Sequence, residues 1–400
     1  MKLPLLKNNL NPLKNVFYFS ILIQFISVIH ILFSGSLNGD FTAFVEVNMF
    51  VLFLSFIASV SPFCFLFFYL KQKQLKEYSA LGEIKYFDTA IISLLVVNIF
   101  LALKYEVGRL ASHDIYQVPF FVKPFIVIVN RIDAYVISGY LIVSNLFSKK
   151  SNLIVIVLLM ILSLSRASVF VFLFLILIYS LSGKLSFSLK KLVVFVVIFL
   201  LTFQFIPMLF DYRESLRNGD EAKLIQIFDT TELVKFVLAK LIGRVSSLSA
   251  VEYFFEHYHQ IVTVKNSIGD FDFIIEFFRP FYGGIFRDEL KSYTYFFTNI
   301  YDPNAGSDYG VMYALPGVLL LSFIKGWYVL LMNVVFIIMI IVFIVRLASF
   351  LFGNIYREFV YILLFSPLMS GVPAEFGQLL FYLLVLSFLK LLYRQIMIRN

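Results

Sequence analysis

Apolar runs that approach or exceed the length of a membrane span recur along most of this 400-residue chain. A transmembrane helix needs about 20 predominantly apolar residues. Apolar segments occupy residues 15–34, 43–70, 86–104, 120–147, 152–164, 167–182, 192–210, 311–324, 327–345, 356–371 and 376–393. A folded globule has too little interior to hide so much apolar surface. The pattern therefore predicts an all-α polytopic membrane protein.

Composition supports this class and excludes several others. Hydrophobic residues make up 60% of the chain and charged residues only 14%, and the mean hydropathy is +0.90. These values exclude a soluble enzyme and a nucleic-acid binder. Cys64 is the single cysteine, so no internal disulfide can form. The four histidines are too scattered for a metal cage, and no Walker or serine-elbow motif occurs, so we expect no metal and no cofactor.

Charge is distributed unevenly along the chain. Residues 211–310 hold 15 of the 25 acidic and 10 of the 33 basic residues, a net charge of −5, although the whole chain carries +8. Lysines gather instead at the N-terminus and in the loops after the second, fourth and sixth apolar segments. Basic short loops are typical of the cytoplasmic side. Both termini are thus predicted to be cytoplasmic and residues 211–310 to lie outside.

The count of spans depends on one segment. If residues 311–324 cross the membrane, Arg394 and Arg399 end outside, against the charge rule. Pro316 and Gly317 favour an irregular, partial element there. We therefore expect about 10–12 transmembrane helices in a single membrane domain over residues 1–400, with one large outer loop at 211–310.

Two arginines lie where a charge is unfavourable. Arg131 falls inside the fourth apolar segment, where a charge costs at least ~2.5–3.5 kcal/mol. It either pairs with an acid such as Asp133 or lines a cavity for an anionic headgroup. Arg166 lies at the tip of an outward Ser-Arg-Ala-Ser hairpin. It either reaches the outer headgroups or binds a pyrophosphate, because guanidinium matches phosphate oxygens.

The outer loop combines arginines with aromatic residues. Arg244 follows Gly243 and precedes two serines, while Arg279 and Arg287 flank a Pro-Phe-Tyr-Gly-Gly turn. Each arginine could form an ordinary ion pair with a loop acid. As a set with aromatics such as Tyr253 and Tyr282, they suit a ligand that is part phosphate and part sugar.

A cluster of titratable residues follows in the same loop. At helical spacing Glu252, Glu256 and His259 share one face, and His257 lies beside them. The cluster is either a solvated helix face or a His–carboxylate general base. Asn304 and Asp308 come just before the segment 311–324, as turn and cap residues or as ligand contacts.

These features together resemble the O-antigen, or oligosaccharide repeat-unit, polymerases of the Wzy type. The resemblance rests on many short-looped spans, the Ser-Arg-Ala-Ser hairpin, one long late loop with Gly-Arg-Val-Ser-Ser-Leu, and the turn Pro303-Asn304-Ala305-Gly306. It implies a multi-pass protein of the bacterial inner membrane with a GT-C-like architecture. The loop 211–310 would then be periplasmic.

The resemblance also implies an activity: metal-independent glycosyl transfer that joins repeat units into O-antigen or a capsule-like polysaccharide. Its partners would be oligosaccharides linked to undecaprenyl pyrophosphate, the lipid bilayer and a chain-length regulator protein, with no nucleic acid. Arg166 and Arg244 would stabilise the leaving pyrophosphate. Arg131, Arg279, Arg287, Tyr253, Tyr282, Asn304 and Asp308 would contact substrate, and the base would come from Glu252, Glu256, His257 and His259.

Two other functions remain open at this point. An O-antigen ligase would use the same donor but transfer the glycan to lipid A–core. A flippase or transporter would carry the lipid-linked oligosaccharide across the membrane. A transporter predicts internal inverted repeats and short loops throughout, whereas this chain has a loop of about a hundred residues and shows no repeat.

Overall fold

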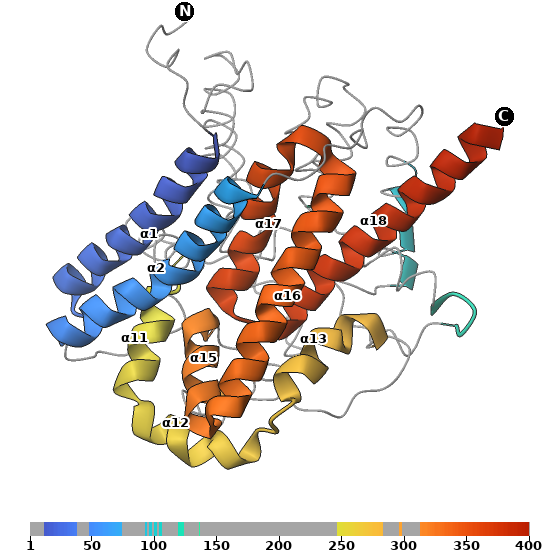
Figure 1. The fold of residues 1–400 in the computed structure, drawn as a ribbon. Coiled ribbons are helices and arrows are strands. Elements are labelled where there is room, and N and C mark those ends of the chain that lie inside the picture. Colours follow the sequence, from blue (N-terminus) through green and yellow to red (C-terminus); the bar gives the residue numbers. More distant parts are fainter. Residues whose placement is uncertain are drawn as a thin grey trace, which may run out of the picture. The chain divides into compact units, whose positions relative to one another are not determined.

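The computed structural model describes residues 12–37, 48–73, 246–282, 296–297 and 313–399, with scattered positions between 93 and 136. The chain divides into two compact units, one of residues 1–15 and 82–241, the other of residues 16–81 and 242–400. Described positions of the first unit include a turn in which the Val122 N–H donates to the Pro119 carbonyl. The second unit is almost entirely helical over its described residues (Figure 1).

Two long helices open the described part of the chain. They are α1 (Pro12–Ser34) and α2 (Met49–Gln72). The Asn48 side chain caps α2, since its Oδ1 accepts from the Phe50 N–H at 3.0 Å and the Val51 N–H at 3.4 Å. The two helices touch through Phe17 and Phe67, whose rings stack with centroids 4.2 Å apart.

The C-terminal third forms a second group of helices. These are α15 (Ala314–Lys325), α16 (Trp327–Phe352), the short 3₁₀ helix η7 (Gly353–Ile355), α17 (Tyr356–Ser370) and α18 (Pro373–Arg399). Gly371 ends α17 in the left-handed region at φ 71°. A side chain there would meet the backbone of Ala314, so only glycine fits the turn.

Among the described residues, four helical stretches are long and apolar enough to cross a membrane: Pro12–Ser34, Met49–Gln72, Trp327–Ser370 and Pro373–Gln395. The third takes in α16, η7 and α17. They coincide with the predicted apolar segments 15–34, 43–70, 327–345, 356–371 and 376–393, which confirms a helical protein with helices suited to a membrane. The predicted segments between 86 and 210 lie almost wholly outside the described residues.

The segment predicted as a partial element, 311–324, is a regular helix of 12 residues, α15. Our expectation that Pro316 and Gly317 make it irregular was wrong. Both residues fall in the first turn of the helix, where a proline removes no intrahelical hydrogen bond. At about 1.5 Å per residue the helix is far shorter than the bilayer core.

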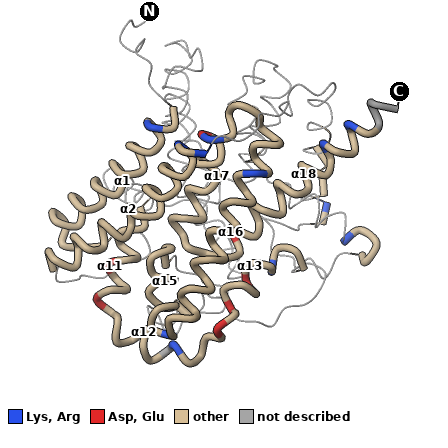
Figure 2. Tube along the Cα trace, in the orientation of Figure 1, with Lys and Arg blue, Asp and Glu red and all other residues tan. Residues whose placement is uncertain are grey.

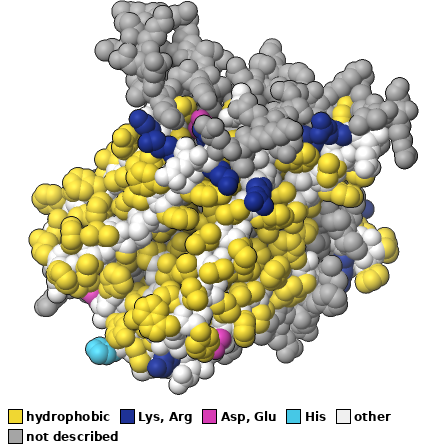
Figure 3. All heavy atoms as spheres, in the orientation of Figure 1, with side chains coloured by type: hydrophobic (Ala, Val, Ile, Leu, Met, Phe, Trp, Pro, Cys, Tyr) yellow, Lys and Arg dark blue, Asp and Glu magenta, His cyan; other side chains and the backbone are white. Residues whose placement is uncertain are grey.

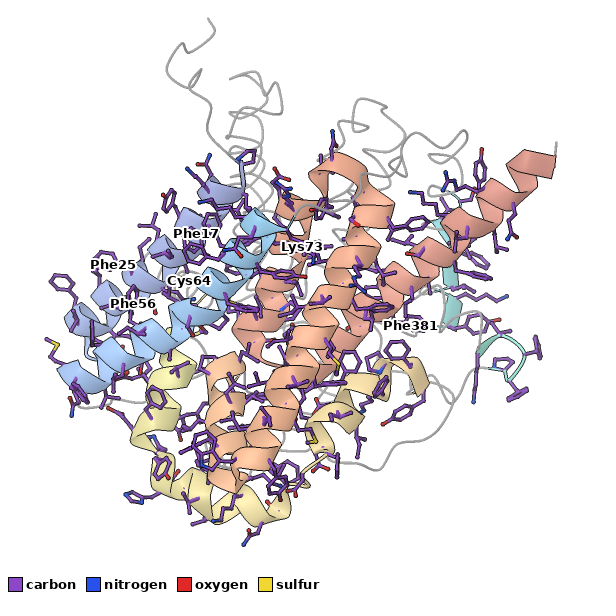
Figure 4. The ribbon with its side chains drawn as sticks, viewed as in Figure 1. Phe17, Phe25, Phe56, Cys64, Lys73 and Phe381 are labelled. Carbon is purple, nitrogen blue, oxygen red and sulfur yellow. The ribbon has the colours of Figure 1, made fainter. Side chains whose placement is uncertain are left out.

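Helix α1 buries its polar residues and exposes its apolar ones, the reverse of a helix in a soluble protein. Ser20, Gln24 and Ser27 recur at helical spacing and are fully buried. The opposite side exposes large apolar residues: Tyr18, Leu22, Phe25, Ile26, Ile29, Leu32 and Phe33. Figure 3 shows apolar side chains over much of the visible face, and Figure 4 shows Phe25 pointing outward from α1. Such a surface suits lipid, which solvates apolar side chains and leaves polar ones to the interior.

Although Lys325 pairs with Asp270 at 2.9 Å near the end formed by α12 and α13, Figure 2 shows most Lys and Arg side chains of the second unit toward the end at which α2 terminates, where Lys71 lies in the last turn of that helix. Two contacts tie this end together. The Tyr356 hydroxyl donates to the Lys73 carbonyl at 3.1 Å, and Lys390 donates to the Phe350 carbonyl. Acidic side chains of residues 252–276 gather at the opposite end.

Candidate functional site

The described part of the predicted outer loop is helical and packs closely on the apolar helices. It comprises α11 (Leu248–Glu256), α12 (Tyr258–Val264), η6 (Lys265–Ser267) and α13 (Asp272–Tyr282). In Figure 1 these helices run around the end of the second unit at which α15 ends and α16 begins. α11 packs on α2 and α15, while α13 packs on α18 and α16. These residues therefore join the helical core directly.

The contact of α13 with α18 is unusually close. Phe273, Glu276, Phe277 and Pro280 form the buried face of α13. A Cβ on Gly377 of α18 would lie 1.8 Å from the Phe277 carbonyl oxygen, so a glycine is required there. Phe281 also packs edge-to-face on Phe381 at 5.2 Å, and Figure 4 labels Phe381 on α18 beside α13.

Glu252 lies on the buried face of α11 and is only 1% exposed. Neither of its carboxyl oxygens has a hydrogen-bond partner among the described residues. The hydroxyls of Ser55 and Ser59, one turn apart on α2, are buried and likewise unpartnered within the described part of the chain. The Ser246 hydroxyl, two residues before α11, donates to the Gln24 amide oxygen of α1 at 2.8 Å. Buried polar groups thus join α11 to α2 at Glu252 and Ser55, and the residues before α11 to α1.

Burial changes the acidity of Glu252. Desolvation penalises the charged form and raises its pKa to about 7, the Ser55 hydroxyl acts to lower the pKa, and the charge of Glu256 raises it. A carboxyl group with this pKa exchanges its proton near neutral pH. Such groups mark functional-site candidates when they also lie in a polar cluster.

His257 is held in one orientation by Tyr253. Its Nδ1 lies 2.8 Å from the Tyr253 carbonyl oxygen, and its ring stacks on the Tyr253 ring at 4.0 Å. A carbonyl oxygen can only accept, so Nδ1 carries the hydrogen and donates it. In the neutral ring Nε2 then keeps the lone pair, which is the state that a general base requires.

Our prediction that Glu252, Glu256 and His259 share one helix face was wrong. α11 ends at Glu256 and α12 begins at Tyr258, because His257 breaks the helix with ψ 25°. The backbone N–H and the Nδ1 of His257 both lie within hydrogen-bond distance of the Tyr253 carbonyl oxygen, at 3.0 Å and 2.8 Å. Glu252 is consequently buried, Glu256 half-buried and His259 exposed.

Glu256 lies next to His257 at the end of α11. Burial raises the pKa of the Glu256 carboxyl, while the charge of His257 acts in the opposite direction. The pair places a carboxyl beside an oriented imidazole. When ionised, this carboxyl would stabilise a protonated His257.

The remaining predicted ligand contacts divide into two groups. Tyr253 is buried, so its ring supports His257 and offers no open face to a sugar. Arg279 and Tyr282 are half-buried in the last turns of α13, which packs on different helices from α11. Arg131, Arg166, Arg244, Arg287, Asn304 and Asp308 lie outside the described residues.

Sequence reasoning missed the polar residues contributed by the apolar helices. Gln24, Ser55 and Ser59 were read as parts of apolar spans. The available signal was their spacing, since Ser20, Gln24 and Ser27 recur on one face of α1 and Ser55 and Ser59 on one face of α2. Within the described residues no group of three or more His, Cys, Asp or Glu could hold a metal ion.

The helices define a protein whose long apolar elements suit a membrane, with buried polar groups where α11 meets α2 and where Ser246 meets α1. A scan against protein-family models, a search of curated proteins and a search of solved structures each found no match to the chain.

Proposed function

We propose that the chain is a membrane glycosyltransferase of the Wzy type that polymerises lipid-linked oligosaccharide repeat units, with His257 as the general base. The observation that carries this proposal is the orientation of His257. Its Nδ1–H is bound to the Tyr253 carbonyl, which leaves Nε2 to accept a proton. Glu256 beside it supplies a carboxyl that stabilises the imidazolium once the proton has moved.

The distribution of charge supports a site on the outer face. Most Lys and Arg side chains of the second unit lie toward the end at which α2 terminates, and α11 to α13 lie at the other end (Figure 2). Under the positive-inside rule the basic end is cytoplasmic. His257 then faces the periplasm of a bacterial inner membrane, where lipid-linked repeat units would be joined.

The proposed reaction balances without a cofactor. The hydroxyl at the non-reducing end of one repeat unit attacks the anomeric carbon of the growing chain, and a new glycosidic bond forms. The bond from that carbon to undecaprenyl pyrophosphate breaks, and the electron pair leaves with the pyrophosphate. The hydroxyl proton passes to Nε2 of His257. Arg166 and Arg244 are the proposed partners of the departing charge.

The experiment is a comparison of glycan profiles from a deletion strain complemented with the wild type or with His257→Asn. We expect the deletion and the variant to leave a single repeat unit on lipid A–core, and the wild type to restore long chains. Membrane levels of both proteins are measured by immunoblot. A deletion strain with no repeat unit on the core would instead indicate a ligase or a flippase.

A purified system separates the polymerase from a transporter. The protein in detergent is supplied with repeat units linked to undecaprenyl pyrophosphate and with no other protein. Formation of longer lipid-linked chains supports the proposal, because a flippase forms no glycosidic bond. Circular dichroism checks that the purified protein is folded. If the folded wild type fails to elongate these units, the result would count against a polymerase that works without a partner.

A further inference from the structure

The interface between α11 and α2 contains a carboxyl group that nothing described neutralises. Glu252 is 1% exposed and both of its carboxyl oxygens lack a hydrogen-bond partner among the described residues. The Ser55 and Ser59 hydroxyls on the facing helix are also buried, and the Ser55 hydroxyl acts on the Glu252 carboxyl. Two carboxyl oxygens and two hydroxyls, which can donate as well as accept, thus lie in an apolar interface with no described basic side chain paired to Glu252.

An ionised carboxylate in this position would be strongly unfavourable. Burying a lone charge costs far more than burying a neutral polar group, and real proteins avoid it by neutralising the group. A protonated carboxyl, in contrast, gains one O–H donor, and serine hydroxyls can accept from it. One added proton therefore lets the Glu252 carboxyl and a serine hydroxyl satisfy each other.

We infer that Glu252, with Ser55 and Ser59, forms a buried proton-binding site that fastens α11 to α2. With the proton bound, the Glu252 O–H donates to a serine hydroxyl across the interface and α11 stays seated. When the proton leaves for bulk water, the carboxylate needs solvation, and α11 separates from α2 to obtain it. This inference does not depend on the proposed glycosyl transfer, although α11 also carries Tyr253 and leads into His257.

No described basic side chain neutralises Glu252, so a bound proton is the group that can do so. On α11 itself Glu256 is the acting charge, and it disfavours ionisation of Glu252. The lysines on the facing helices α15 and α2 either form an ion pair with another residue or lie several turns from Ser55. Lys325 of α15 is paired with Asp270 at 2.9 Å, and Lys71 lies in the last turn of α2, four turns from Ser55.

The other neighbours are histidines and a thiol. His259 of α12 is exposed, and His30 of α1 is half-buried, with its Nδ1 3.3 Å from the Ser34 hydroxyl. Cys64 lies more than two turns beyond Ser55 on α2. No described lysine or arginine forms an ion pair with Glu252, so the described surroundings favour a neutral acid.

Infrared spectroscopy tests the site directly. A neutral carboxylic acid has a carbonyl stretch that the carboxylate lacks, and the band is followed in purified protein in detergent as pH is raised. We expect one such band to disappear with a midpoint near pH 7 and to be missing in Glu252→Gln. A band that titrates in the same way in Glu252→Gln would overturn the assignment.

Two further variants should move the midpoint in opposite directions. Ser55→Ala removes a hydroxyl that favours the carboxylate, so the midpoint should rise. Glu256→Gln removes a neighbouring negative charge, so the midpoint should fall. Equal midpoints in all three proteins, or a midpoint that moves with sodium concentration at constant ionic strength, would rule out a proton site made by these residues.

Hydrogen–deuterium exchange tests the coupling to α11. After correction for the intrinsic effect of pH, amides of Leu248–Glu256 should exchange faster at pH 8 than at pH 6 in the wild type. In Glu252→Gln, whose amide mimics the neutral acid, their protection should be independent of pH. Residues of α16 act as the internal control. Equal protection of α11 at both pH values in the wild type would overturn the proposed fastening.

Discussion

The imidazole of His257 lies on the ring of Tyr253 with the centroids 4.0 Å apart and the planes 18° from parallel, and its Nδ1 meets the carbonyl of the same residue. One residue thus fixes both the plane and the tautomer of the histidine. The orientation is local, since Tyr253 and His257 lie one helical turn apart. It does not require a third element to position the base.

Asparagine and glutamine substitutions at His257 separate its two nitrogen atoms. In His257→Asn the amide can reproduce the Nδ1 donor, and in His257→Gln it reaches toward the Nε2 position, but neither amide accepts a proton. We expect both variants to lose about 10²–10⁴-fold in the rate of chain elongation. The rate is measured with purified protein and lipid-linked repeat units.

His259→Asn is the matched control, because His259 is exposed and lies outside the stacked pair. It should elongate chains at close to the wild-type rate. An equal loss in the His257 and His259 variants would argue against His257 as the base.

Stability should depend on pH through Glu252. Burial raises its pKa to about 7 from 4.5, so the folded protein binds the proton more tightly than the unfolded chain. The free energy of unfolding should therefore fall as pH rises from about 4.5 to 7 and then level off. The total effect is about 3 kcal/mol, from ~1.36 kcal/mol per pKa unit. Thermal unfolding in detergent, followed by circular dichroism, measures it.

Glu252→Gln should remove this pH dependence. The free energy of unfolding of the variant, measured relative to the wild type, should therefore be higher at pH 8 than at pH 5. Ser55→Ala keeps the carboxyl and should extend the decline to higher pH. A wild-type melting temperature that rises between pH 5 and pH 7, with the rise absent in Glu252→Gln, would contradict the assigned sign.

The contact between α13 and α18 leaves no room for a methyl group at Gly377. Gly377→Ala should push α13 away from α18, because the new Cβ would overlap the Phe277 carbonyl. Overpacking of this kind costs about 1–3 kcal/mol, and more when the backbone cannot move. We expect a lower melting temperature and faster proteolysis within α13.

Gly317→Ala provides a graded comparison. Its Cβ would lie 3.1 Å from Cδ2 of the Phe254 ring, so that the ring would need to move by only a few tenths of an ångström. The loss of stability should be clearly smaller than for Gly377→Ala. If Gly317→Ala were the more harmful change, the contact at Phe277 would not be the limiting one.

Trp327 provides a natural probe of membrane depth. It is the only tryptophan in the chain, is 74% exposed and begins α16 beside exposed Tyr328. Tryptophan and tyrosine favour the membrane–water interface. In vesicles, its fluorescence should be quenched most by lipids brominated near the headgroup and less by lipids brominated near the chain end.

The reverse order is expected for Met339→Trp in a Trp327→Phe background. Met339 is exposed on the same helix, and twelve residues at ~1.5 Å place it near the bilayer centre. Quenching of both tryptophans by the same lipid would show that α16 does not stand across the membrane.

Sequence periodicity predicted the long helices because a span is an intrinsic property of a continuous apolar run. Residues 15–34 became Pro12–Ser34, and 376–393 became Pro373–Arg399. The error in this part of the prediction arose because the effect of a proline depends on where the helix begins. Pro316 was expected to disrupt an element that in fact begins two residues before it.

The candidate site was harder to predict, because it depends on contacts between distant segments. Helical spacing placed Glu252 and His259 on one face, but the chain leaves the helical conformation at His257, between α11 and α12. The meeting of Glu252 with Ser55 joins residues far apart in the chain. Spacing within either segment could show which face is polar but not which faces meet.

The fit of Ala314 against Gly371 has a consequence for biosynthesis. α15 is too short to be released into lipid on its own, and the turn that covers its first residue is translated only after α16 and α17. We therefore expect the insertion machinery to retain α15 while more than forty further residues emerge from the ribosome. Ribosome-stalled intermediates truncated before Gly371 should leave α15 cross-linked to the translocon.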